Sequence, residues 1–132
     1  MIIKNEFPPN YDAIVDKFPF VKKLKTVVFC YGDVLYNPYN GPIQEHLLVH
    51  ERTHTKQQGN DVEGWWNKYL NDSAFRFQQE LEAYRNQYEY FASHNDRDTR
   101  RWFLKMIATD LSSAMYGNIV DFHKAKELIQ NK

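Results

Sequence analysis

Two histidines four positions apart, His50 and His54, constrain the fold of this chain more than any other feature of its sequence. Residues with this spacing share one face of an α-helix, with their Cβ atoms about 6 Å apart. Glu51 follows His50 directly and is rotated by about 100° around the helix axis. The apolar residues 47–49 lead into this segment, so we expect the helix to lie inside the domain rather than on its surface.

This arrangement of side chains predicts a metal site. Two imidazoles on one helix face can bind one zinc ion from the same side, and burying them without a partner would be unfavourable. Glu51 would lie beside the ion, where its carboxylate can take a proton from a zinc-bound water and later deliver it to a leaving amine. The His-Glu-x-x-His pattern therefore predicts His50 and His54 as zinc ligands and Glu51 as the catalytic general base.

His46 lies four residues before His50, so a pair formed by His46 and His50 also has workable spacing. All three histidines cannot share one ion, because about 12 Å of helix axis separates His46 from His54. Only the later pair has a glutamate directly after its first histidine. We therefore expect His46 to support the site or to face the substrate.

A catalytic zinc site also needs a third protein ligand. A histidine six residues after His54 is excluded, because Asn60 occupies that position and Gln57 replaces the glycine that such a pattern requires. The alternative is a carboxylate downstream of the motif. The candidates are Asp61, Glu63, Asp72, Glu80, Glu82 and Glu89.

Helix geometry narrows this set of carboxylates. Asp61 and Glu63 follow the motif too closely to fold back onto it, and Asp72 is suited to capping a helix. Glu80 and Glu82 point about 200° apart on one predicted helix, so at most one of them faces the metal. Ala83 lies beside Glu80 on the same face, where a small side chain lets two helices approach closely.

The remaining pattern predicts a mainly α-helical, α+β domain with one small β-hairpin before the motif helix. Residues 25–31 and Val34–Tyr36 are rich in β-branched and aromatic side chains, which favours two strands joined at Gly32-Asp33. Glycine, proline and capping residues divide the rest of the chain into helices. We expect these helices at Tyr11–Lys17 and at residues 42–58, 61–70, 73–91, 98–112 and 119–130.

Length and composition are typical of a single domain covering residues 1–132. Lys and Arg number 17 and so do Asp and Glu, which argues against nucleic acid or an anionic membrane surface as a partner. The N-terminus lacks an apolar run long enough for a signal peptide, and no segment approaches the about 20 apolar residues of a membrane span. We expect a cytoplasmic protein, or one that leaves the cell by lysis or within a multiprotein assembly such as a virion. Cys30 is the single cysteine and is expected to be a buried core thiol.

The sequences HERTH at residues 50–54 and ELEAY at residues 80–84 together resemble the gluzincin zinc metallopeptidases. In several of these proteins the third ligand is a glutamate followed three residues later by alanine, on a helix antiparallel to the motif helix. The resemblance therefore makes Glu80 the third zinc ligand. Position 84 departs from the family, because Tyr84 stands where an acidic residue is common. The resemblance covers residues 26–90 and points to the compact single-domain forms of bacteria and phages, which implies a minimal zincin-like domain.

The same resemblance implies zinc-dependent hydrolysis of peptide bonds in a peptide or protein substrate. It further implies that Val34–Tyr36 is an edge strand that pairs with extended substrate. The alternative is a catalytically silent, zinc-stabilised structural or binding module, for example inside a viral particle, because 132 residues leave room only for a shallow cleft.

Several polar side chains near the motif have more than one reading. Tyr69, Tyr84 and Tyr116 are the candidates for the group that stabilises an oxyanion. Gln57 and Gln58 either hydrogen-bond to the site or simply end the helix. Arg76, four residues before Glu80, either orients that carboxylate or forms a surface ion pair.

Overall fold

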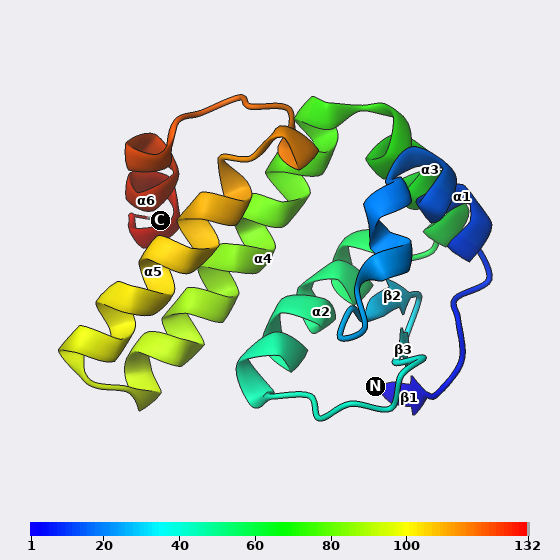
Figure 1. The fold of residues 1–132 in the computed structure, drawn as a ribbon, viewed down its shortest axis with the longest axis horizontal. Coiled ribbons are helices and arrows are strands. Elements are labelled where there is room, and N and C mark those ends of the chain that lie inside the picture. Colours follow the sequence, from blue (N-terminus) through cyan, green and yellow to red (C-terminus); the bar gives the residue numbers. More distant parts are fainter. Residues whose placement is uncertain (132) are drawn as a thin grey trace.

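The computed structural model describes residues 1–131 and builds that range from six α-helices, two short 3-10 helices and a three-stranded sheet (Figure 1). The predicted mainly α, α+β fold class is confirmed. The strands are β1 (Ile2–Lys4), β2 (Phe29–Tyr31) and β3 (Val34–Tyr36). The helices are α1 (Tyr11–Lys17), η1 (Pro19–Lys23), α2 (Glu45–Gln58), α3 (Val62–Asn71), α4 (Ser73–His94), α5 (Arg97–Leu111), η2 (Ala114–Tyr116) and α6 (Phe122–Gln130), where η marks a 3-10 helix.

The predicted hairpin is present, but it belongs to a larger sheet than expected. β2 and β3 pair antiparallel across a turn in which Gly32 has a φ of 65°, in the left-handed region that favours glycine. β1 pairs in parallel with β3, so the strand order is β1-β3-β2. The prediction that Val34–Tyr36 is an edge strand is therefore wrong, because β3 has a neighbour on both sides. The edge strand that packs against α2 is β2.

Aspartates set the starts of four helices. The side chains of Asp61, Asp72, Asp96 and Asp121 each accept a hydrogen bond from the backbone N–H three residues ahead, which satisfies one of the free donors at the helix start. The predicted starts of α2 and α6 are each three residues too early, since α2 begins at residue 45 rather than 42 and α6 at residue 122 rather than 119. The motif helix ends where expected, at Gly59 with a φ of 51°.

Two hydrophobic clusters form the core, and α2 and α4 pack against each other between them. One cluster joins α4, α5, α6 and η2 and includes Phe103, Ile107 and Leu111. The other joins α1, η1, the sheet and α3 and includes Phe18 and Trp65. Figure 1 shows these two halves on opposite sides of the α2–α4 pair. The motif helix therefore lies at the junction of the two halves of the domain.

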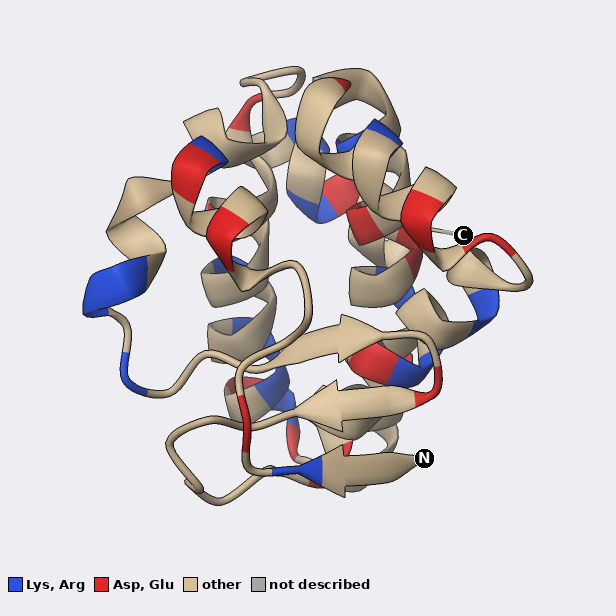
Figure 2. Cartoon of the chain, turned by 90° about the vertical axis from the view of Figure 1, so that its right-hand side faces the viewer, with Lys and Arg blue, Asp and Glu red and all other residues tan. Residues whose placement is uncertain are grey.

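Charged residues are spread over the helices rather than gathered on the sheet. In the view of Figure 2, acidic and basic positions are interspersed along the helices. The three strands together contain one charged residue, Lys4. Within residues 1–131, none of the helices has the length and apolar character that crossing a lipid bilayer requires.

Candidate metal centre

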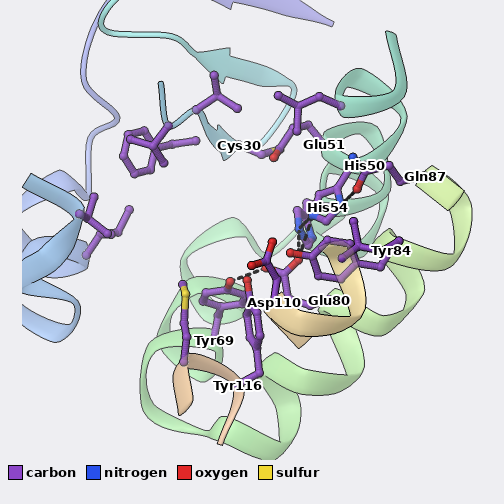
Figure 3. Close-up of a pocket in the computed structure, with 18 of the residues that line it drawn as sticks. Cys30, His50, Glu51, His54, Tyr69, Glu80, Tyr84, Gln87, Asp110 and Tyr116 are labelled. Atoms are coloured by element: carbon purple, nitrogen blue, oxygen red, sulfur yellow. Dashed lines mark hydrogen bonds and ion pairs between the residues drawn. The ribbon is translucent and has the colours of Figure 1, made fainter. Parts of the chain in front are cut away.

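Packing of α2 against α4 brings three buried side chains together (Figure 3). His50 Nε2 lies 2.9 Å from Glu80 Oε1, and His54 Nε2 lies 3.1 Å from the same oxygen. The two Nε2 atoms are 3.2 Å apart. In the described part of the chain, His50, His54 and Glu80 form a group whose ligand atoms all lie within 4.8 Å of one another. The structure thus brings together the three residues expected from the sequence.

The spacing of these atoms fits a zinc ion. Bonds of about 2.0–2.1 Å in a tetrahedral site separate neighbouring ligand atoms by about 3.3 Å. The three observed separations, 2.9, 3.1 and 3.2 Å, require only a slight expansion of the group. Two imidazoles and one carboxylate are also the ligand set of a well-known type of catalytic zinc site.

The second ring nitrogen of each histidine has a glutamine amide as its partner. His50 Nδ1 lies 2.7 Å from Gln87 Oε1, and His54 Nδ1 lies 2.8 Å from Gln57 Oε1. An amide oxygen only accepts hydrogen bonds, so each Nδ1 carries the proton in this arrangement. A neutral ring of this tautomer presents the lone pair of Nε2 to the centre of the site.

The same three groups interact strongly without a metal. Burial lowers the pKa of His54, but the adjacent Glu80 carboxylate outweighs burial and raises that pKa to about 9. Burial raises the pKa of Glu80, but the charge of His54 and the hydrogen-bonding contacts with His50 and His54 hold that pKa well below its usual range. At neutral pH the metal-free His54 is therefore a positively charged imidazolium with a proton on each ring nitrogen. The proton on Nε2 must leave before this nitrogen can bind a metal.

Glu51 is buried in the wall of the same cleft as the three ligands. Burial raises the pKa of its carboxyl group, although the two neighbouring histidines oppose this shift. A raised pKa makes a carboxylate a stronger base at neutral pH. Cys30, the buried thiol expected from the sequence, also lines the cleft, where burial and the charge of Glu51 raise the pKa of the thiol to about 12.

Three tyrosines surround the ligand cluster (Figure 3). Tyr69 donates a hydrogen bond to Glu80 Oε2, the oxygen that does not face the histidines. The ring of Tyr84 packs against His50 with 4.7 Å between ring centroids, and its hydroxyl interacts with that of Tyr116. Burial is the main cause that raises the pKa of all three phenols well above the usual value, so each remains a proton donor at neutral pH.

The three candidate ligands lie in a cleft of about 350 Å³ between the two halves of the domain. The N-terminal half contributes side chains of α1, η1, α3 and residues 26–30, including Ile14 and Trp66. The C-terminal half contributes Phe103, Met106 and Tyr116. The walls are thus mainly apolar and aromatic, with few polar groups besides the His50, His54 and Glu80 cluster, which is typical of a ligand-binding pocket.

No protein-family model matches this chain, and no curated protein or solved structure does either. The geometry and chemistry of the cleft therefore carry the functional argument.

The structure separates the two mid-helix glutamates as predicted. Glu80 is buried in the ligand cluster, whereas Glu82 is exposed and accepts a hydrogen bond from Gln57 at 2.8 Å. Ala83 is fully buried on α4, the helix that packs against α2. His46 has the supporting position that was one of its two readings, because it hydrogen-bonds to Gln87, the partner of His50.

Of the two alternatives for Gln58, the structure supports the helix end, because Gln58 is the last residue of α2. Its amide bridges the β2–β3 hairpin by donating to Cys30 O and accepting from Gly32 N. The expectation for Arg76 fails. Arg76 is neither a surface residue nor a partner of the Glu80 carboxylate. It is buried and donates to the backbone oxygens of Tyr69 and Met115, so it joins α3, α4 and η2.

Two residues near the site carried no sequence signal. Gln87 lies seven residues after Glu80, on the same helix face, and its spacing gives no metal-site pattern. Asp110 comes from α5 and interacts electrostatically with both Glu80 and His50. Burial, followed by the negative charge of Glu80, raises the pKa of Asp110.

Proposed function

We propose that this chain is a zinc-dependent peptidase of the gluzincin type. In this proposal His50, His54 and Glu80 hold the zinc ion, and Glu51 is the catalytic base. The observation that carries it is the convergence of one carboxylate oxygen on two Nε2 atoms, at 2.9 and 3.1 Å, inside an apolar cleft. Burial of three polar groups that meet at one point is unfavourable unless they bind one another or an ion.

The proposed reaction divides the work between the ion and the protein. A bound zinc would supply a Lewis acid that polarises the scissile carbonyl and increases the acidity of water. Glu51 accepts a proton from the attacking water and then delivers it to the leaving nitrogen. Its raised pKa supports both steps, because the carboxyl group must first take the proton and then release it.

An oxyanion donor is available next to the ligands. Tyr69 already donates its hydroxyl proton to Glu80, which makes it unsuitable. Tyr84 and Tyr116 line the cleft and remain protonated, so the proposal assigns the role to one of these two.

The substrate backbone would pair with the chain just before β2 rather than with β3. β2 is an edge strand, and residues 26–30 line the cleft. The carbonyl of Cys30 is already occupied by Gln58 and Trp66, at 3.0 and 3.1 Å. Residues 26–28 therefore remain as the part of this edge that extended peptide can reach.

Metal content is the first test of this proposal. We expect about one zinc ion per chain after purification, and its loss in His50→Ala and His54→Ala, because two ligands remain in each variant. The proposed site is refuted if the wild type binds no transition metal at neutral pH and a chelator leaves its melting temperature unchanged.

Turnover of a broad peptide library is the second test. The zinc-loaded wild type should cleave members of the library, and Glu51→Gln should retain zinc but not cleavage. A folded, zinc-loaded wild type that cleaves nothing would instead support the alternative function, a zinc-stabilised structural or binding module.

A further inference from the structure

We infer that Gln57 and Gln87 are positioning residues that hold His54 and His50 in the tautomer that can bind a metal. The inference rests on the proposed zinc site, and its evidence is the direction of the hydrogen bonds around each amide. Each glutamine contacts one ligand histidine with its oxygen and a second group with its nitrogen.

The orientation of Gln57 is determined by its other partners. Its Nε2 lies 2.9 Å from Gln79 O and 2.8 Å from Glu82 Oε1, and both of these oxygens only accept hydrogen bonds. The amide nitrogen must therefore face them, which turns Oε1 toward His54 Nδ1 at 2.8 Å. The proton of a neutral His54 is thus held on Nδ1, and Nε2 is left free for the ion.

Gln87 belongs to a longer chain of hydrogen bonds. His46 Nε2 lies 2.6 Å from Gln44 Oε1, and His46 Nδ1 lies 2.9 Å from Gln87 Nε2. When His46 donates to Gln44, it accepts from Gln87, and Gln87 Oε1 accepts from His50 Nδ1 at 2.7 Å. If donor and acceptor exchanged roles in every hydrogen bond of this series, Gln87 would donate to His50 Nδ1. The proton of a neutral His50 would then lie on Nε2, where it blocks metal binding.

If Gln87 controls the tautomer of His50, variants at position 87 should differ in zinc affinity in an order that side-chain packing alone does not predict. Gln87→Met keeps the size of the side chain but removes the acceptor for His50 Nδ1. Gln87→Glu places a carboxylate at a position that is 5% exposed, but it can only accept and so enforces the metal-binding tautomer. If Gln87 only filled space, the buried charge would make Gln87→Glu the more damaging variant.

The test is a zinc affinity measured by competition with a chromophoric chelator at neutral pH. We expect Gln87→Met to bind zinc about 10–100-fold more weakly than the wild type, the usual effect of losing a hydrogen bond to a ligand. Gln87→Glu should bind zinc at least as tightly as the wild type. Gln78→Met, at an exposed position of α4, is the matched control and should leave the affinity unchanged.

Gln57→Met extends the test to the other histidine. This residue is half-buried in the last turn of α2, so its replacement is compatible with folding even if position 87 does not tolerate Met. We expect a loss in zinc affinity of the same size, about 10–100-fold.

Three outcomes would overturn the inference: wild-type affinity in folded Gln87→Met, wild-type affinity in folded Gln57→Met, or weaker binding by Gln87→Glu than by Gln87→Met. Wild-type protein without zinc affinity would instead refute the proposed metal site, so the two failures are distinguishable.

Discussion

Replacing Glu80 by glutamine tests the assignment of the third ligand most directly. The change keeps the size of the side chain but removes the charge and one of the two oxygens, so the amide cannot match the carboxylate as a zinc ligand. Glu82→Gln is the matched control, because it makes the same chemical change two residues away on an exposed face of α4. The amide oxygen of that variant can still accept the hydrogen bond from Gln57.

The size of the effect follows from linkage between zinc binding and folding. Free zinc buffered at about 100 times the wild-type Kd stabilises the native state by about 2.7 kcal/mol. Losing a hydrogen-bond partner of a ligand weakens metal binding by up to about 100-fold, so losing the ligand itself should weaken it at least that much. At the same free zinc concentration, the stabilisation by zinc then falls to about 0.4 kcal/mol. With an unfolding entropy of about 2.1 cal/mol/K per residue, 132 residues give about 3.6 °C per kcal/mol. Zinc should therefore raise Tm by about 10 °C in the wild type and by about 1–2 °C in Glu80→Gln.

Thermal unfolding followed by circular dichroism, with and without buffered zinc, measures this difference. Glu82→Gln should show the full wild-type shift of about 10 °C. A full zinc-dependent shift in Glu80→Gln would refute the reasoning, and so would loss of the shift in Glu82→Gln alone, because that result would move the ligand to the opposite face of α4.

Four further predictions follow from the cleft and its side chains. Glu51→Gln should retain zinc and lower kcat/KM for a cleaved peptide by about 10²–10⁴-fold, since an amide cannot accept the proton; activity near the wild-type value would exclude Glu51 as the base. Because the pKa of metal-free His54 is about 9, zinc binding at neutral pH should release a proton, and the zinc affinity should rise with pH until about 9. Calorimetry in buffers of different ionisation enthalpy counts this proton, and no release would contradict the His54–Glu80 pairing. Pairing with Glu80 also raises the pKa of His54 above its ordinary 6.5, so protonated His54 stabilises the folded, metal-free protein. This contribution to the free energy of unfolding should be lost as pH rises from 6.5 through about 9. Cys30, with a pKa of about 12, should react with thiol reagents far more slowly in the native protein than in denaturant, and equal rates would show that the thiol is not buried.

The residues of the site that share one helix could be predicted from the sequence. His50, Glu51 and His54 were predictable, because their mutual geometry depends only on the repeat of one helix. The opposite directions of Glu80 and Glu82 follow from the same repeat, and the structure confirms that Glu80 is the residue that meets the histidines. The Asp72 cap at the start of α4 was also predicted, since capping is a contact between residues three positions apart, but the start of α6 at Asp121 was not.

Relations between elements were not predictable in this way. The two-residue turn of the hairpin is local, but the parallel pairing of β1 joins Ile2 to Val34 across 32 positions and changes which strand has a free edge. The predicted edge at Val34–Tyr36 was wrong for this reason. Three residues of strand are also too few to give a clear alternating pattern in the sequence.

The sequence by itself determined a mainly helical chain with two histidines and a glutamate on one internal helix, because these features depend on short-range periodicity. Only the tertiary structure decided what surrounds them. Gln87 reaches His50 across 37 positions, and Asp110 approaches Glu80 from another helix. Arg76, which helix spacing placed beside Glu80, instead donates to the backbone at Met115, 39 positions away. Such contacts depend on how whole helices pack, and packing is governed by the complementary shapes of their buried faces rather than by the spacing of residues within one helix.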